Sequence, residues 1–389
     1  MRDLRTDPAV SVAILGGGQL ARMMIYESRK LGLRFSVLDS SEDVPAGKLA
    51  DRFYSGSLES ASDLERIILE NDVTTYDIEH INTEALGRLS EAGHAIFPAP
   101  EILAIIQDKG IQKKHLQDAG IPVPAFSLFD PPAQILSAPT LPVPFPAVQK
   151  ARRGGYDGRG VAVLRNEDDL DTMLPVPSML EEFVDFEVEL AVMVARDRKG
   201  QVLSYPVAEM YFDENANICD TVIAPARFGE RVEAEARRIA EETVVALAGV
   251  GVFGIELFLT KDGKILVNEV APRPHNSGHY TIEGCVTSQF EQHIRAVAGF
   301  PLGSTDLHRP AVMFNLLGAP GFSGRPVVRG LSEALAIPGA SVHLYGKSET
   351  RPYRKMGHVT VTGRDVETVL GKAERVRECI RIEGERNDG

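Results

Sequence analysis

The chain has 389 residues, 43% hydrophobic and 25% charged, which are ordinary proportions for a globular protein and predict two or three domains. No apolar run approaches the roughly 20 residues of a membrane helix, and the first eight residues lack the apolar core of a secretory signal. The net charge of −13 without a basic stripe opposes nucleic-acid binding, and three widely spaced cysteines favour a reducing cytoplasm, so we expect neither membrane nor nucleic-acid partners.

The first hundred residues alternate between short apolar runs and amphipathic stretches. Strands are predicted at 11–15, 35–38 and 74–78, and helices at 19–30, 61–71 and 83–92. This alternation predicts a Rossmann-like α/β domain with a parallel sheet.

Eight prolines between residues 122 and 146 forbid a regular helix and mark a junction to a second domain. Beyond it we predict strands at 147–150, 161–164, 190–195, 202–207, 252–259 and 264–270, and a helix at 230–248. A last segment holds strands at 312–317, 342–344 and 358–361 and a helix at 366–379. We therefore expect domains at 1–107, 108–308 and 309–389.

A glycine motif, Gly16-Gly17-Gly18-Gln19-Leu20-Ala21, follows the first strand and opens the first helix, and Asp39 ends the next strand. This matches the Gly-x-Gly-x-x-Gly/Ala pattern of dinucleotide-binding folds, and a tight structural turn explains it equally well. Glu79 and His80 follow a later strand and would lie over the same sheet edge, either at a ligand or as a solvated strand end.

The segment from Lys150 to Gly160 combines four glycines with four cations. Glycine N–H groups can fold around phosphates while neighbouring cations neutralise them, although no Gly-Lys-Ser/Thr completes a Walker loop. The alternative is a basic hairpin without a ligand.

Asp262-Gly263 lies between two apolar runs and predicts a two-residue hairpin turn. That turn would place Glu256 opposite Glu269, and two facing carboxylates repel each other. A divalent cation between them would remove the repulsion, because Mg²⁺ is held by one or two carboxylates together with substrate phosphates. A solvated face that tolerates both charges is the alternative.

A polar stretch, Ala271-Pro-Arg-Pro-His-Asn-Ser-Gly-His279, leaves the second of these strands. Arg273, His275, Asn276 and Ser277 can donate hydrogen bonds to an anion, and zinc is disfavoured because partner ligands are missing at a metal-site spacing. Lys347 and Arg354 bracket a loop between two later strands, where on their own they indicate ordinary surface charge.

Together these motifs resemble the ATP-grasp superfamily and, within it, the 5-(carboxyamino)imidazole ribonucleotide synthases, over nearly the whole chain. The most specific segments are 16–20, 154–160, 181–186 and 268–279. The resemblance implies an ATP-grasp fold at 108–308, between the N-terminal Rossmann-like domain and a small β-rich C-terminal domain. Many relatives have a histidine where this chain has Phe212.

The resemblance also implies a role for each site residue. The ATP contacts would be Lys109, Lys150, Gly155, Asp157, Gly158, Gly160, Glu181, Glu182, Phe183, Val184, Glu189, Asn268 and Glu269. Mg²⁺, or Mn²⁺ in its place, would be held by Glu256 and Glu269. The ribonucleotide would contact Gln19, Leu20, Glu79, Tyr156, Arg159, Ser277, Lys347 and Arg354. The catalytic residues would be Arg273, His275 and Asn276.

The implied activity is the carboxylation of 5-aminoimidazole ribonucleotide in purine synthesis, with ATP and bicarbonate, through carboxyphosphate. The family further implies a homodimer that passes its product to a separate mutase. Three alternatives are open: a formate-dependent ribonucleotide transformylase, a nicotinamide-dependent oxidoreductase built on the glycine motif and Asp39, and a nonenzymatic nucleotide-binding module.

Overall fold

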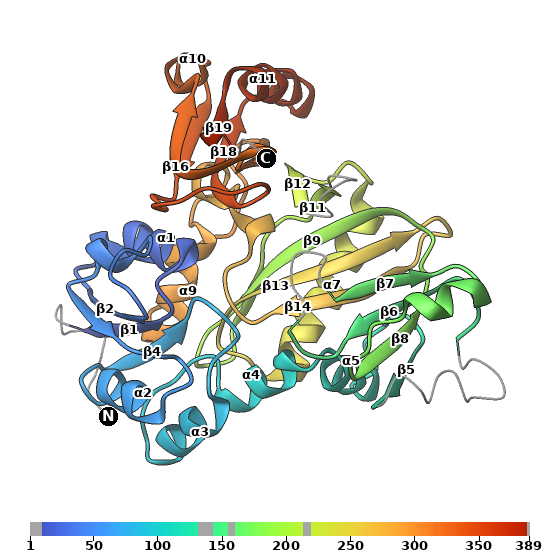
Figure 1. Cartoon of the computed structure of the whole chain (residues 1–389), viewed down its shortest axis with the longest axis horizontal. Helices are drawn as coiled ribbons and strands as arrows, with labels where there is room; N and C mark the ends of the chain where they lie inside the picture. The colour runs from blue at the N-terminus through green and yellow to red at the C-terminus, as the bar shows by residue number, and fades with distance from the viewer. Residues whose placement is uncertain (1–9, 131–142, 155–159, 213–218, 387–389) are drawn as a thin grey trace.

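The computed structural model describes residues 10–130, 143–154, 160–212 and 219–386 (Figure 1). The N-terminal region is a parallel sheet, as the sequence predicted, of order β3-β2-β1-β4. Its strands are β1 (Ser11–Leu15), β2 (Arg34–Asp39), β3 (Arg52–Ser55) and β4 (Val73–Tyr76), of which β3 is absent from the prediction. Its helices are α1 (Gln19–Ser28), α2 (Ala61–Leu69) and α3 (Thr83–Glu91). Two helices absent from the prediction, α4 (Pro100–Gln107) and α5 (Lys109–Asp118), lead into the middle region.

Both faces of this first sheet are buried, which explains the continuous apolar run of β1. Val12 and Ile14 pack with α1 on one face, whereas Ala13 and Leu15 pack with α2 and α3 on the other. A helix from far along the chain, α9 (Gln289–Ala298), completes the first face, so the N-terminal and middle regions share one core.

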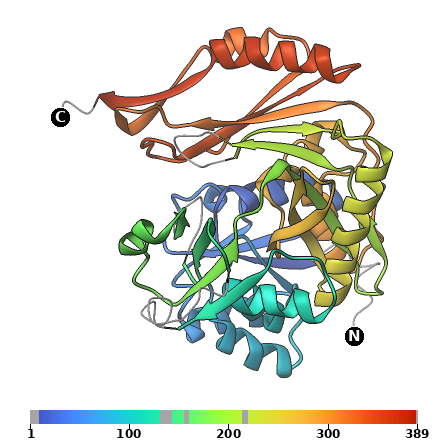
Figure 2. The same cartoon turned by 90° about the vertical axis from the view of Figure 1, so that its right-hand side faces the viewer.

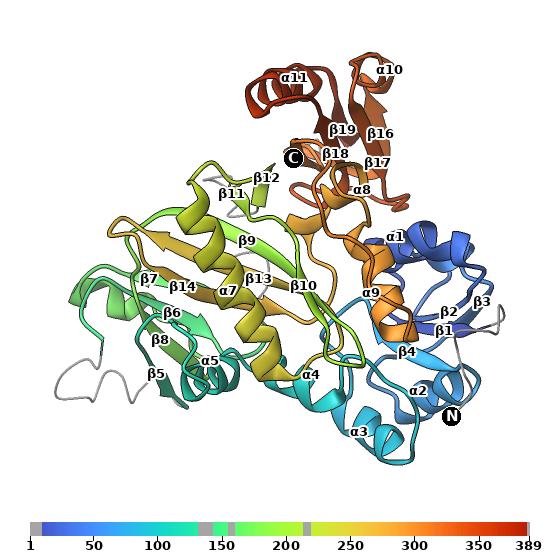
Figure 3. The ribbon, with the colours of Figure 1, turned by 180° about the vertical axis from the view of Figure 1, so that it is seen from behind.

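The middle region is built on a large antiparallel sheet that runs β14-β13-β9-β11-β12 and continues through β15-β18-β17. Its strands are β9 (Phe186–Arg196), β10 (Val202–Ser204, paired to β9), β11 (Ala208–Phe212), β12 (Cys219–Ala224), β13 (Gly251–Thr260) and β14 (Ile265–Ala271). Helix α7 (Glu230–Leu247) crosses one face of this sheet (Figure 3). Its buried residues recur at helical spacing, at 236, 239, 240, 244 and 247, and pack on the strands.

A second antiparallel sheet, of order β5-β8-β6-β7, lies beside β14 at the lower right of Figure 1. Its strands are β5 (Phe126–Phe129), β6 (Ala147–Ala151), β7 (Val161–Leu164) and β8 (Ser178–Glu182). The proline-rich junction thus includes one short strand, β5, which itself contains no proline and lies at the edge of the sheet.

The C-terminal strands β15 (Ala311–Leu317), β17 (Ala340–Leu344) and β18 (Lys355–Thr362) extend the large sheet, because β15 pairs with β12. Strand β16 (Phe322–Arg329) pairs with β19 (Arg381–Arg386). Helices α10 (Leu331–Leu335) and α11 (Val366–Cys379) cover the outer side of this layer, away from the other regions (Figure 2). The mixed α/β fold class expected from the sequence is confirmed. Among the described residues, no helix combines the length and apolar composition needed to cross a membrane.

A buried histidine links the first two regions. His293 on α9 accepts the Val252 N–H at Nδ1, 3.0 Å away, and its Nε2 lies 2.6 Å from the Thr75 hydroxyl on β4. Burial lowers the pKa of His293 to about 3, so the ring is neutral in the folded protein at neutral pH.

This neutral ring predicts a loss of stability in acid. Between pH 6.5 and about 3 the unfolded chain binds a proton at His293 that the folded chain does not, so stability falls with falling pH by about 1.4 kcal/mol per pH unit from this residue. Urea unfolding should show a shallower pH slope for His293→Gln below pH 6.5, whereas His308→Gln, at an exposed position, should keep the wild-type slope. Parallel slopes for all three proteins would contradict the assignment.

Candidate functional site

The hairpin between β13 and β14 has a three-residue turn, so the predicted two-residue turn is wrong. The Thr260 N–H donates to the Lys264 carbonyl at 2.9 Å, and Gly263 takes a positive φ of 81°. This turn shifts the pairing by one residue, so Leu257 faces Val267.

A β-bulge then reverses the shift. Asn268 is the extra residue, and beyond it Glu256 faces Glu269. The predicted carboxylate pair is therefore confirmed, although a turn and a bulge together produce it where the sequence pattern suggested a turn alone.

The two paired carboxylates differ in their electrostatic surroundings. Burial, with Glu269 and Glu189 nearby, raises the pKa of Glu256 to about 8. Burial also raises the pKa of Glu189, on the neighbouring strand β9, to about 7. The ammonium of Lys109, 2.6 Å from Glu269 Oε1, outweighs burial and lowers the pKa of Glu269. The site thus concentrates acidic groups that an additional cation would stabilise.

The donor set fits a hard divalent cation. It offers two carboxylates, Glu256 and Glu269, and the side-chain amide of Asn268, all of which present oxygen. Within the described residues, no group of three or more His, Cys, Asp or Glu side chains is placed to hold a metal alone. Such a cation would take its remaining ligands from water and from a bound phosphate, as Mg²⁺ does at nucleotide sites.

Three lysines surround these acids. Besides Lys109, Lys150 on β6 lies 2.5 Å from Glu181 Oε2 and donates to Asn268 Oδ1 at 3.0 Å. Lys113 on α5 lies 2.7 Å from Glu181 Oε1, and both of these side chains are only 2% exposed. Burial lowers the pKa of Lys113 to about 8, whereas the two lysines outweigh burial and lower the pKa of Glu181. The sequence analysis named Lys109 and Lys150 but missed Lys113.

Two cations of the glycine-rich segment serve the fold. Asp108 accepts hydrogen bonds from Arg152 Nε and Nη2 at 3.0 and 2.9 Å, and Arg153 lies 3.4 Å from it. Asp108 also caps α5, so this cluster fixes Lys109 at the start of that helix. Gly160 begins the return strand with φ 77°. The remaining predicted contacts of this segment lie outside the described residues, namely Gly155, Tyr156, Asp157, Gly158 and Arg159.

The segment 181–184 connects the two antiparallel sheets. Glu182 ends β8, and its carboxylate accepts the Ala125 N–H at 3.0 Å. Phe183 is exposed, and Val184 leads into β9. The contact of this connection with a nucleotide base stays a prediction.

The polar loop after β14 joins the site to the N-terminal region. Arg273 Nη2 lies 2.7 Å from Glu79 Oε1, and this pair raises the pKa of Arg273 although burial opposes it. His275 Nε2 lies 3.6 Å from Glu256 Oε1, and its Nδ1 lies 2.9 Å from the Ser277 hydroxyl. Arg273 and His275 therefore flank the acid pair.

Asn276 is turned toward the C-terminal region. It exchanges two amide hydrogen bonds with Asn315 on β15, at 2.9 and 2.8 Å, and Asn315 also donates to the Cys219 carbonyl. In this arrangement Asn276 fixes the polar loop to β15, and its catalytic role stays a prediction. The sequence offered no indication of Asn315.

The backbone N–H groups of the glycine motif are occupied by carboxylates of the protein itself, so we call it a filled motif. Asp77 accepts the N–H groups of Gly18 and Ala21 at 2.5 and 3.1 Å, and Asp39 accepts that of Gly17 at 2.8 Å. These carboxylates occupy the N–H groups that a pyrophosphate would use in a dinucleotide fold. Of the two interpretations left open by the sequence, the structure favours a structural turn.

Among the described residues, two of the predicted ribonucleotide contacts open α1, and the loop that holds two more packs against the same core. Gln19 is half-buried at its first turn, whereas the Leu20 side chain packs in the core with Tyr345 of the loop between β17 and β18. In that loop Lys347 donates to the Lys355 carbonyl at 2.6 Å, and Arg354 donates to the Glu349 carbonyl at 2.7 Å.

This loop is positively charged. Burial and the neighbouring Arg351 lower the pKa of Arg354, so the loop concentrates cationic charge. Lys355, the first residue of β18 and also missed from the sequence, extends this charge toward Glu256, where it offsets a small part of the rise in pKa that burial causes.

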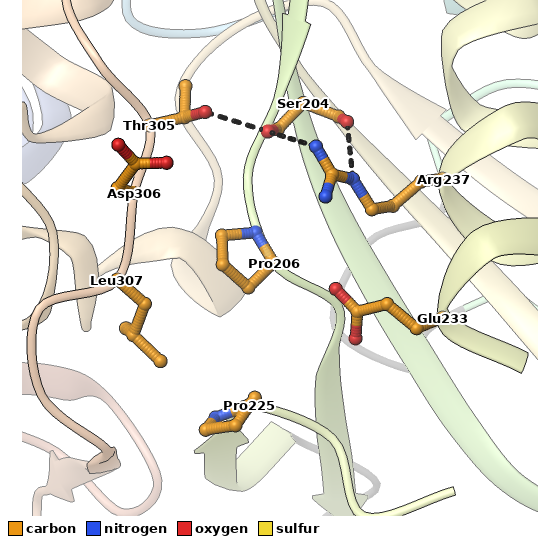
Figure 4. Close-up of a pocket in the computed structure, with 8 residues that line it drawn as sticks. All are labelled: Ser204, Pro206, Pro225, Glu233, Arg237, Thr305, Asp306 and Leu307. Carbon is orange, nitrogen blue, oxygen red and sulfur yellow. Dashed lines mark hydrogen bonds between the residues drawn. The ribbon is translucent and has the colours of Figure 1, made fainter. Parts of the chain in front are cut away.

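A separate pocket of about 490 Å³ lies away from these residues (Figure 4). Its lining is Ser204, Pro206, Pro225, Glu233, Arg237, Thr305, Asp306 and Leu307. The Ser204 carbonyl accepts hydrogen bonds from Thr305 and Arg237, and Arg237 Nε donates to the Ser204 hydroxyl. These polar groups satisfy one another, and none of the predicted site residues lines the pocket.

Comparison with known proteins assigns each region to a family. Residues 10–107 match the ribonucleotide synthetase preATP-grasp domain, and residues 114–290 match the ATP-grasp domain. Residues 311–372 match the phosphoribosylaminoimidazole carboxylase C-terminal domain.

Relatives that match over most of the chain support the same grouping. The chain is 38% identical to the N5-carboxyaminoimidazole ribonucleotide synthase of Bacillus subtilis, over 91% of each protein. It is 41% identical to the phosphoribosylaminoimidazole carboxylase of Ogataea methanolica, covering 92% of this chain and 67% of that protein. The chain spans about two thirds of the length of such yeast and plant carboxylases.

Solved structures give the same grouping. The N5-carboxyaminoimidazole ribonucleotide synthetase of Thermotoga maritima is 52% identical, with a TM-score of 0.89 over 97% of this chain and all of that chain. The Aspergillus clavatus synthase in complex with ADP and 5-aminoimidazole ribonucleotide is 34% identical, with a TM-score of 0.86 over 96% and 98% of the two chains.

The filled glycine motif predicts the behaviour of Gly17→Ala. A Cβ at Gly17 would lie 2.4 Å from Val44 Cγ2, so we expect a loss of about 1–3 kcal/mol in the free energy of unfolding. The affinity of the folded protein for ADP, measured by calorimetry, should stay unchanged. Gly87→Ala is the control, since no atom lies within 4 Å of its added Cβ in α3 and roughly 0.5–1 kcal/mol should be gained. Native stability with lost ADP affinity in Gly17→Ala would restore the nucleotide role of the motif.

Proposed function

Because the chain belongs to the N5-carboxyaminoimidazole ribonucleotide synthase family of ATP-grasp, ATP-dependent ligases, we propose that it carboxylates 5-aminoimidazole ribonucleotide at the expense of ATP and bicarbonate. The observation that carries the proposal is the Glu256–Glu269 pair, flanked by Lys109 and Lys150 on one side and by Arg273 and His275 on the other. Nucleotide phosphates and a second anion would meet between these two groups.

The proposed chemistry follows from the weak electrophilicity of bicarbonate. A bicarbonate oxygen attacks the γ-phosphorus of ATP, ADP leaves, and carboxyphosphate results. The exocyclic amine then attacks the carboxyl carbon, or CO₂ released from it, while phosphate departs with the transferred oxygen and the amine loses a proton. Catalysis would come mainly from positioning and electrostatic stabilisation.

Each group of residues has a part in this scheme. Lys109 and Lys150 would bind phosphates, the 181–184 connection would contact the base, and Glu189 would bind the ribose. Glu256 and Glu269 would hold Mg²⁺, or Mn²⁺, which neutralises phosphate charge when bound. Arg273 and His275 would orient bicarbonate. The ribonucleotide would lie along α1 and Glu79, with its phosphate at Lys347 and Arg354.

The proposal also includes the cellular compartment and the partners of the enzyme. The cysteines Cys219, Cys285 and Cys379 are all free thiols, which agrees with a reducing cytoplasm. We propose a homodimer whose product is used by a separate mutase.

Phosphate release separates this function from its rivals. Release should require ATP, bicarbonate and 5-aminoimidazole ribonucleotide together, formate should not replace bicarbonate, and NADH should not bind. With ¹⁸O-labelled bicarbonate, one labelled oxygen should appear in the phosphate, because carboxyphosphate carries that oxygen. Unlabelled phosphate would exclude the carboxyphosphate route, and activity with formate would favour the transformylase.

The acid pair predicts the effect of Glu269→Gln. The change removes a negative charge that faces the cation while nearly preserving the shape of the side chain, so the fold should persist and nearly all ATP cleavage should be lost. Phosphate release at saturating Mg²⁺ is the measurement. Glu187→Gln, at an exposed position near the start of β9, is the control. Nearly full activity of Glu269→Gln would contradict the metal pair.

The cationic loop predicts the effect of Lys347→Met and Arg354→Met. A charge-assisted hydrogen bond to a phosphate monoester is worth roughly 1.5–3 kcal/mol, so each change should raise the KM for the ribonucleotide at least about tenfold. The KM for ATP should change little, and Arg354→Lys should recover part of the loss, because one ammonium cannot replace a bidentate guanidinium. Wild-type ribonucleotide KM values in both Met variants would remove this loop from the substrate site.

A further inference from the structure

The outer edge of β14 has no neighbouring strand among the described residues, and side chains of α5 bind its backbone instead. The Gln112 amide accepts the Val270 N–H at 3.2 Å and lies 3.4 Å from the Val270 carbonyl, to which it donates. The Val267 N–H donates to the Pro122 carbonyl at 2.8 Å. Helix α5 and the segment after it thus take the place of a further strand.

Lys113 binds the part of this edge where the bulge lies. Its ammonium donates to the carbonyls of Val267 and Asn268, at 3.1 and 2.9 Å. Asn268 is the extra residue that brings Glu269 opposite Glu256, so the carbonyls on both sides of the register change share one buried donor. An irregular backbone with buried carbonyls is stable only where such a donor is supplied.

The third partner of Lys113 is in the other sheet. Glu181 on β8 lies 2.7 Å from the same ammonium and 2.5 Å from Lys150. Lys113 therefore joins the bulge of β14, through two hydrogen bonds, to the strand that leads into the 181–184 connection, through its ion pair with Glu181. Removing the ammonium would leave the bulge carbonyls without this donor, and Glu181 buried beside Lys150 alone.

We propose that Lys113 is a positioning residue that fixes the β14 bulge, and through it the orientation of Asn268 and Glu269 toward the cation and nucleotide phosphates. The inference rests on the proposed function and deepens it. Lys113 itself would touch neither the nucleotide nor the ribonucleotide, because its buried ammonium is already held between the two bulge carbonyls and the Glu181 carboxylate.

The test compares Lys113→Met with Lys114→Met, the adjacent lysine of α5, whose side chain is 57% exposed and pairs with Asp118. Calorimetry measures ADP affinity with Mg²⁺ and with EDTA, and electron paramagnetic resonance measures Mn²⁺ bound in the presence of ADP. Lys113→Met should weaken Mn²⁺ binding, and ADP binding with Mg²⁺, at least tenfold, with a much smaller loss in EDTA. Lys114→Met should match the wild type in each measurement.

A second pair of variants keeps the test decisive if Lys113→Met unfolds. The double variant Lys113→Met/Glu181→Gln removes both buried charges and should fold, yet it should bind Mn²⁺ in the presence of ADP at least tenfold more weakly than Glu181→Gln alone. Equal Mn²⁺ affinity in these two proteins would overturn the proposal, as would equal ADP losses with Mg²⁺ and with EDTA in Lys113→Met. Failure of the proposed function is a different result, because it would appear as wild-type protein that binds ADP but does not release phosphate with bicarbonate and ribonucleotide.

Discussion

The repulsion between Glu256 and Glu269 is the constraint on which the rest of the site depends. Two carboxylates face each other across β13 and β14, with Glu189 on the next strand, and burial makes their charges harder to stabilise. Sheet pairing alone would disfavour this arrangement. It is maintained because Lys109 pairs with one acid directly, and because the bulge and turn of the hairpin leave no other register that keeps the apolar residues of β14 on the core side. The remaining negative charge would favour a divalent cation, as the proposed function requires.

The net negative charge of the chain opposes the binding of anions at this site. In the proposed function, a protein of charge −13 would bring together nucleotide phosphates, bicarbonate and a phosphate monoester. Its cations are therefore local and fixed: Lys150 is tied to Asn268, Arg273 to Glu79, and Lys347 to a backbone carbonyl. Each is held by a short bond before any ligand arrives, so little reorganisation is needed when the anions bind. Short-range electrostatics at low dielectric then outweigh the distant acidic surface.

The sequence predicted correctly those features that depend on the local spacing of apolar and polar residues. The parallel sheet, α7 and α11 follow from the spacing of apolar residues. The acid pair was predicted from a two-residue turn; the turn is one residue longer, and the bulge at Asn268 compensates for the difference in register. Sequence reasoning failed where a residue acts through tertiary contact. Lys113 looks like any helical lysine until α5 is placed against β14, and Asn315 is one polar residue in an apolar strand until it meets Asn276. The glycine motif shows a different kind of failure. Its pattern is typical of a dinucleotide site, but its N–H groups bind carboxylates of the protein itself.

The filled glycine motif disfavours a dinucleotide in this region and agrees with the proposed ribonucleotide site. Asp77 and Asp39 occupy the N–H groups of Gly17, Gly18 and Ala21, so these groups are not open to a phosphate. The cationic loop between β17 and β18 lies beside the same helix, because Tyr345 packs into the core around it. A ribonucleotide placed along α1 would then direct its phosphate toward the C-terminal region and its base toward Glu79 and Arg273. In the proposed function each of the three regions would contribute one part of the substrate site; the three regions share a core, and the large sheet runs through the last two of them.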